Sequence, residues 1–126
     1  MRTQDENAVK ISILGTEYKI TKKTKQEDIR LARCDGYIDT SVKKIVVGTY
    51  DRAIDANPAM AVDNSEYGEQ WAMRHEIVHA FFFESGLDND SGLGGNELLV
   101  DWIALQLPKM AKAMRKAGCL DCEAIP

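Results

Sequence analysis

Alternating apolar and polar positions predict strands in the first half of the chain. Residues 9–20, VKISILGTEYKI, alternate on both sides of a Gly-Thr pair, which indicates a strand, a turn and a second strand. Two further β-rich runs, at 37–40 and 44–47, flank a polar turn and predict a second hairpin. The charged segment between the hairpins, residues 21–33, has no clear period and is interpreted as a loop or a short irregular helix.

Helical spacing of apolar residues predicts two long helices in the second half. Between residues 66 and 85 the apolar positions fall on more than one side, as expected for a central helix, and Gly86 is placed to end it. A second helix is expected after Asn96, which can act as its N-cap. Pro108 should kink this helix or begin a new one. Together these elements predict the α+β class, with an N-terminal antiparallel sheet packed against the helix at 66–85 and the helix that begins near 96 completing the site.

Composition places the chain among ordinary globular proteins. Its 126 residues suit a single domain spanning 1–126, with 44% apolar and 29% charged side chains. The net charge of -4, from 20 acidic and 16 basic side chains, argues against a nucleic-acid partner. The N-terminus lacks the apolar stretch of a secretory signal, and no apolar run approaches the roughly 18 residues of a membrane span. We therefore expect a cytoplasmic protein with no membrane partner, while its oligomeric state stays open.

The three cysteines, Cys34, Cys119 and Cys122, are an odd number without the spacing of a disulfide framework. This pattern favours reduced thiols. Cys119 and Cys122 have the spacing of a zinc knuckle or a redox site, but structural zinc normally needs four N or S ligands. Two free thiols near the C-terminus are the favoured interpretation.

The segment RHEIVHAFFFESG, residues 74–86, contains the pattern His-Glu-x-x-His and both histidines of the chain. Residues four apart lie on one face of a helix, so His75 and His79 can bind one metal ion together. Glu76 lies one step around the helix, where a general base can reach a metal-activated water without binding the metal. The rival interpretation is a structural helix whose histidines are half-buried and hydrogen-bonded.

A catalytic zinc ion needs three protein ligands and one open position. The segment GGNELLVDW supplies Glu97 as a third ligand and Asp101, four residues later on the same face, as an acceptor for a histidine N–H. Taken alone, these two acids also fit a solvated pair in the first turn of a helix. Peptide deformylases take a ligand from an upstream cysteine, but the surroundings of Cys34, LARCDGYI, do not resemble theirs.

The two segments together resemble the gluzincin zinc peptidases, in which His-Glu-x-x-His is followed after a loop by Asn-Glu-x-x-x-Asp. The closer likeness is to the compact ImmA/IrrE-like proteins of bacteria and their phages. This resemblance implies a minimal zincin-like core that binds one zinc ion per chain through His75, His79 and Glu97. It also implies that Glu76 is the catalytic general base and that Asp101 supports a ligand.

Peptide hydrolysis in a bacterial cytoplasm is the function implied by this resemblance, which covers about residues 36–110. The substrate is expected to be a peptide or protein, held in extended form beside an edge strand such as 44–47. The alternative is a zinc-stabilised binding or regulatory protein of phage or prophage origin that does not turn over a substrate. Hydrolysis also needs a donor that stabilises the oxyanion, and four candidates remain open: Tyr37, Tyr50, Tyr67 and Arg74.

Overall fold

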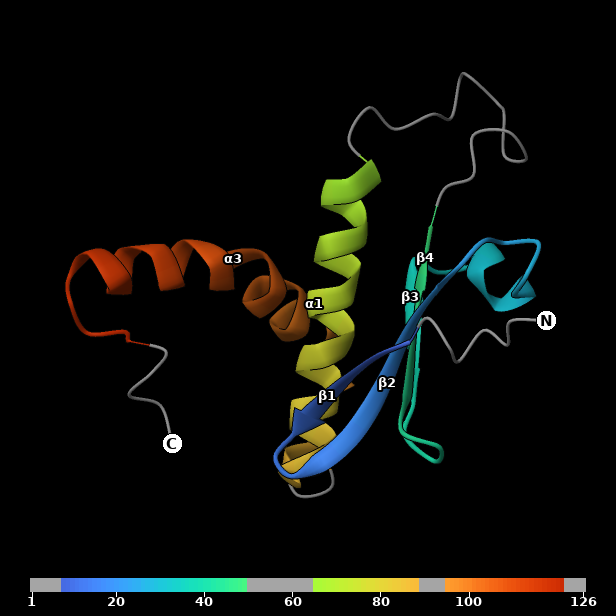
Figure 1. Cartoon of the computed structure of the whole chain (residues 1–126), viewed down its shortest axis with the longest axis horizontal. Coiled ribbons are helices and arrows are strands. Elements are labelled where there is room, and N and C mark those ends of the chain that lie inside the picture. Colours follow the sequence, from blue (N-terminus) through green and yellow to red (C-terminus); the bar gives the residue numbers. More distant parts are fainter. Residues whose placement is uncertain (1–7, 50–64, 89–94, 122–126) are drawn as a thin grey trace.

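A four-stranded mixed sheet and two long helices make up the part of the chain that the computed structural model describes, residues 8–49, 65–88 and 95–121. Figure 1 shows the sheet on one side of helix α1 (Ser65–Glu84) and helix α3 (Glu97–Lys116) on the other. The predicted α+β class is therefore confirmed. Within these residues, no helix is both long enough and apolar enough to cross a membrane.

Strands β1 (Val9–Ile13) and β2 (Thr16–Lys23) form the predicted N-terminal hairpin. Its two-residue turn has positive φ at both Leu14 (50°) and Gly15 (89°), which is the backbone of a tight turn that matches the twist of paired strands. β2 continues to Lys23, beyond the predicted strand end at residue 20. The first residues of the charged segment 21–33 therefore belong to the sheet. The rest of this segment contains a short 3-10 helix, η2 (Ile29–Ala32), in agreement with the predicted loop or short helix.

Strands β3 (Gly36–Asp39) and β4 (Lys44–Gly48) form the second predicted hairpin, but the sheet is mixed and not antiparallel as expected. β4 pairs with β2 in parallel, which gives the strand order β1-β2-β4-β3. The prediction of an edge strand at 44–47 is also wrong, because β4 is bonded on both sides and the edges are β1 and β3. The residues from Ile45 to Val47 are fully buried, so β4 is apolar on both faces, as an inner strand requires.

The hydrophobic core lies between the sheet and α1. Strand side chains such as Tyr18 are completely buried and belong to one cluster with Ala72 and Ala80 of α1. On another side α1 contacts α3, whose Val100 and Ala104 are also fully buried. α1 therefore buries apolar residues on two sides, which confirms the predicted central helix.

Glu84, the last residue of α1, connects this helix to both hairpins. Its carboxylate accepts hydrogen bonds from Thr16 Oγ1 at 2.9 Å, from Tyr18 Oη at 2.7 Å and from Lys43 Nζ at 2.9 Å. These hydrogen bonds lower the pKa of Glu84 to about 2, and the one from Tyr18 has the largest effect. Gly86 follows with a φ of 84°, as predicted for the residue that ends the helix.

α3 is one continuous helix although it contains Pro108, so this proline does not begin a new helix. The predicted N-cap is confirmed, because the side chain of Asn96 accepts a hydrogen bond from the backbone N–H of Leu99 at 3.1 Å. Pro108 has no N–H for the carbonyl of Ala104, four residues before it. Nε of Arg74 on α1 donates to that carbonyl at 2.7 Å instead. The two helices are thus joined where the proline interrupts the hydrogen-bond ladder of α3.

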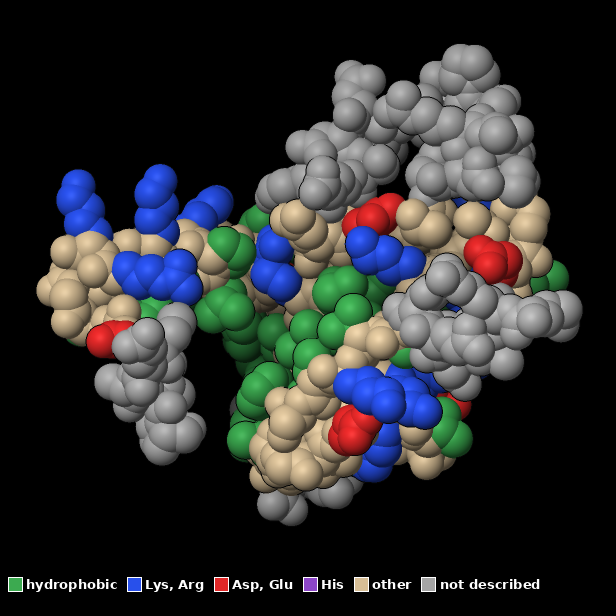
Figure 2. Space-filling view, viewed as in Figure 1, with side chains coloured by type: hydrophobic (Ala, Val, Ile, Leu, Met, Phe, Trp, Pro, Cys, Tyr) green, Lys and Arg blue, Asp and Glu red, His purple; other side chains and the backbone are tan. Residues whose placement is uncertain are grey.

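The C-terminal half of α3 extends beyond α1 (Figure 1). Figure 2 shows Lys and Arg side chains gathered along it, and the exposed basic residues of this half are Lys109, Lys112, Arg115 and Lys116. The acidic Glu97 begins the same helix at its other end. Positive charge is therefore concentrated at the end of α3 that lies away from the candidate metal ligands.

Candidate metal centre

His75 and His79 lie one turn apart on α1 and point to the same place. Their Nε2 atoms are 3.2 Å apart, and their side chains are only 13% and 15% exposed. The four-residue spacing produces this arrangement, because it returns to the same face of a helix. Two nitrogen ligand atoms are therefore already close enough to share one ion.

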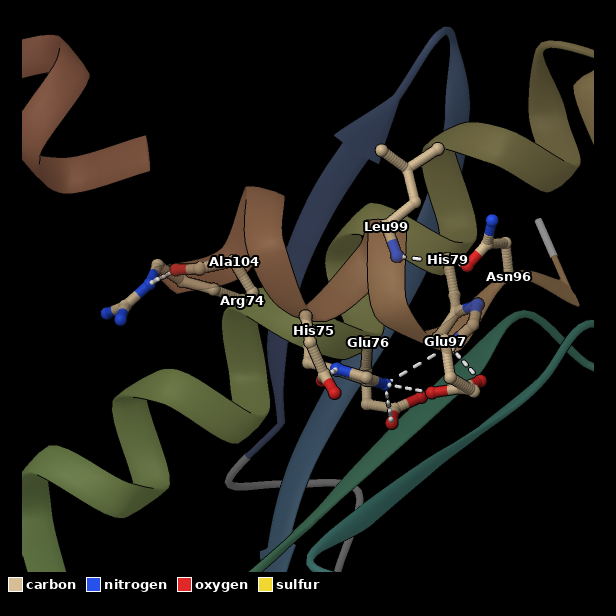
Figure 3. A network of polar contacts seen from close by, with 9 residues as sticks. Arg74, His75, Glu76, His79, Asn96, Glu97, Leu99 and Ala104 are labelled. Carbon is tan, nitrogen blue, oxygen red and sulfur yellow. Dashed lines mark hydrogen bonds and ion pairs between the residues drawn. The ribbon is translucent and has the colours of Figure 1, made fainter. Parts of the chain in front are cut away.

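Glu97 completes the group from the first turn of α3. Its Oε2 lies 2.9 Å from Nε2 of His75, and its Oε1 lies 2.9 Å from Nε2 of His79 (Figure 3). In a tetrahedral zinc site with bonds of about 2.1 Å, neighbouring ligand atoms are roughly 3.4 Å apart. The two nitrogens and the carboxylate already lie near that spacing, so these residues fit a small divalent ion.

Asp101 lies behind His75, one turn after Glu97. Its Oδ1 is 2.7 Å from Nδ1 of His75, and apart from each other these two buried atoms have no polar partner among the described residues. A carboxylate at this position favours the tautomer with hydrogen on Nδ1, which leaves the lone pair of Nε2 free for a metal. The sequence predicted a supporting role for Asp101, and the structure places it against His75.

Glu76 is the most buried acid of the site, with 7% of its surface exposed. Its nearest carboxylate oxygen is 3.9 Å from Nε2 of His75, and no hydrogen bond from a described residue reaches it. Burial raises the pKa of Glu76 to about 7; His79 opposes this shift and Glu97 adds to it. Figure 3 shows its carboxylate beside Glu97 and the two histidines, close to the place where these side chains could hold an ion.

Gly36 allows β3 to pair closely with β4 at a position beside Glu76. A Cβ atom at this position would lie 2.9 Å from the carbonyl oxygen of Val46 and 3.5 Å from Cγ of Glu76. Only glycine fits at that distance from the neighbouring strand. The role of Gly36 was not predicted from the sequence, because a glycine at the start of a strand has the same local pattern as one in an ordinary turn.

A cavity of about 520 Å³ opens over the site between β3 and α1. Its wall on the sheet side is formed by residues 34–38, which include most of the edge strand β3. On the helical side it is lined by Trp71 and Ala72 together with His75, Glu76, His79 and Glu97. The candidate ligands and Glu76 are therefore accessible from a concave surface that is bounded by an edge strand.

Of the four residues considered as donors to the oxyanion, Tyr37 and Arg74 are described with their side chains, and both are hydrogen-bonded elsewhere. Tyr37 lines the cavity, but its hydroxyl donates a hydrogen bond to Asp28, and the pKa of Tyr37 is raised to about 12 by burial and by that carboxylate. Arg74 points away from the ligands toward the carbonyl of Ala104 (Figure 3). Tyr50 lies outside the described residues, and Tyr67 lies within α1 at a position whose side chain is not described.

The cysteines are not among the ligand atoms that converge. Cys34 lines the cavity as an exposed free thiol, and only His75, His79 and Glu97 form a group with metal-ligand spacing in the described residues. Cys119 is also a free, exposed thiol, and Cys122 lies outside the described part of the chain.

No protein-family model matches the chain, and no curated protein or solved structure is significantly similar to it. The site is therefore interpreted from its own geometry. Two histidines, a carboxylate between them, a second carboxylate behind one histidine and a buried glutamate converge from two helices.

Proposed function

We propose that the protein is a zinc-dependent peptidase, in which His75, His79 and Glu97 bind one zinc ion and Glu76 is the general base. The observation that supports this most is the position of Glu76: it is buried, receives no hydrogen bond from a described residue and lies next to three converging ligand atoms without being one of them. A purely structural metal site has no use for such a group. The sheet with α1 and α3 then forms a minimal zincin-like core.

Each side chain of the site has a separate task in this proposal. When bound, zinc supplies a Lewis acid that polarises the peptide carbonyl and acidifies water. Glu76 accepts the proton of the attacking water and passes it to the leaving amine. Asp101 orients His75 through Nδ1, and the backbone of β3 at Gly36 lies beside Glu76.

The substrate in this proposal is an extended peptide that lies beside β3. This strand is an edge of the sheet and lines the cavity, whereas the strand at 44–47 is enclosed by its neighbours. An edge strand has backbone N–H and C=O groups that can pair with a peptide by strand addition. Such pairing would hold a peptide bond above Glu76 and the ligand atoms.

The alternative is a zinc-stabilised binding or regulatory protein that does not hydrolyse peptides. It is favoured by the oxyanion candidates, because the hydroxyl of Tyr37 is engaged with Asp28 and Arg74 points away from the cavity. Both functions predict the same zinc ligands. They differ in whether the parent protein cleaves a peptide and in whether cleavage depends on Glu76.

Metal analysis and two substitutions separate these functions. The purified protein should contain about one zinc ion per chain, and Glu97→Ala should lose it because a three-ligand site then has only two. Glu76→Gln should keep the zinc and abolish cleavage of a peptide library. Glu17→Gln, which changes an exposed carboxylate of β2, is the matched control and should alter neither result. A zinc-containing parent protein that cleaves no peptide would favour the binding function, and a native protein without metal would exclude both.

A further inference from the structure

The cavity wall around the candidate metal centre contains acidic side chains but no basic one. Among the described residues that line it, Asp35, Glu76 and Glu97 are acidic, and no Lys or Arg is present. A zinc ion would balance the two glutamates, which leaves the charge of Asp35 uncompensated. Asp35 is therefore the acidic residue of the cavity wall whose charge the ion would not balance.

Asp35 is held in place but its carboxylate is free. Its backbone carbonyl accepts a hydrogen bond from the N–H of Gly48 at 2.8 Å, which fixes the residue at the start of β3. Its side chain is exposed and makes no hydrogen bond or ion pair with a described residue. The nearby Asp28 differs, because its carboxylate already binds Tyr37 and Arg30. Asp35 is thus a fixed charge on the cavity wall; it also lines a smaller neighbouring cavity together with Lys25, with which it forms no ion pair.

Two further observations indicate that the cavity is built for a ligand. Glu76 is more than nine-tenths buried and lines the cavity without a hydrogen-bond partner among the described residues. On the α1 side, Trp71 offers an aromatic surface that suits the stem or the head of a cationic side chain.

We infer that the cavity selects a cationic group of the bound peptide, a Lys or Arg side chain next to the peptide bond at the metal centre, with Asp35 as its counter-ion and Trp71 as its apolar wall. This inference rests on the proposed peptidase function for the place of the peptide. The α-ammonium group at the amino terminus of a peptide carries the same charge as a Lys side chain. The test must therefore distinguish a cationic side chain from a free amino terminus. A carboxylate in the same position is repelled by Asp35.

Peptide binding to the zinc-loaded parent protein, measured before turnover by stopped-flow fluorescence, tests the inference without any need for cleavage. The probes are fluorescent octapeptides of Gly and Ala, N-acetylated and C-amidated, with one central Lys, Leu or Glu, and a fourth Leu peptide with a free amino terminus. The central-Lys peptide should bind about fivefold to tenfold more tightly than the Glu peptide at low salt. This preference should shrink in high salt, because Asp35 is exposed.

Asp35→Asn in the same protein should remove the preference for Lys, and Asp35→Lys should reverse it toward Glu, while Glu17→Gln should leave it unchanged. Equal binding of the Lys and Glu peptides, no binding of any probe, or a preference that persists in Asp35→Asn would overturn the inference. A preference for the free amino terminus over the central Lys would overturn the side-chain assignment. If the parent protein cleaves peptides without this preference, only the inference fails; if it prefers Lys but never cleaves, only the proposed peptidase function fails.

Discussion

Replacement of Arg74 by methionine should loosen the contact between α1 and α3. The Nε of Arg74 donates to the carbonyl of Ala104, whose usual helical donor is missing because Pro108, four residues later, has no N–H. Ala104 is fully buried, so the carbonyl loses its partner in a place that water does not reach. Methionine preserves much of the aliphatic stem, so the substitution mainly removes the donor.

The magnitude follows from the kind of hydrogen bond that is lost. A hydrogen bond from a charged group contributes about 1.5–3 kcal/mol, and a buried carbonyl without a partner costs a similar amount. We therefore expect Arg74→Met to lower the free energy of unfolding by about 2 kcal/mol. In a Pro108→Ala background, the new backbone N–H can bond the carbonyl of Ala104, so the same substitution should cost about 1 kcal/mol less.

Urea denaturation of the four proteins, followed by circular dichroism, measures this coupling as a double-mutant cycle. The experiment is done with a chelator present, because bound zinc would add its own stabilisation to the native state. Lys112→Met, which removes an exposed cation of α3, is the control and should change the free energy of unfolding by less than about 0.5 kcal/mol. If Arg74→Met costs the same in the parent protein and in the Pro108→Ala background, the idea that Arg74 acts through the carbonyl of Ala104 is refuted.

Three further predictions concern the metal centre and the contacts that position it. Asp101→Asn should weaken zinc binding about 10-fold to 100-fold, measured by competition with a chromogenic chelator, because His75 loses its carboxylate partner; an unchanged affinity would contradict this. Gly36→Ala should destabilise the fold by about 1–3 kcal/mol in urea, because its Cβ would meet the carbonyl of Val46, and unaltered stability would show that β3 can move away. Glu84→Gln should lower stability at pH 7. Since the pKa of Glu84 is about 2 in the folded protein and 4.5 ordinarily, this difference should vanish as pH falls from about 4.5 to about 2, and a constant gap in acid denaturation curves would contradict the role of its charge.

The sequence determined the elements whose signals are local. Alternation predicted both hairpins, and the apolar spacing on more than one side predicted α1 as a central helix. Asn96 was recognisable as an N-cap because the cap binds a backbone N–H three residues away. The pairing of His75 with His79 was equally local, since the helix alone places residues four apart on one face.

Tertiary structure decided everything that depends on which distant segments meet. The parallel pairing of β4 with β2 could not be derived from either strand. After β2 the chain first forms the edge strand β3 and only then β4, which lies between β2 and β3. That pairing makes β3 the edge strand and brings Asp35 to the cavity. Likewise, Pro108 remains inside α3 because a side chain of another helix satisfies the carbonyl that it leaves free, and only the packing of α3 on α1 brings Arg74 there. Local patterns thus specified which residues are available as ligands, while long-range packing set the surface on which they are presented.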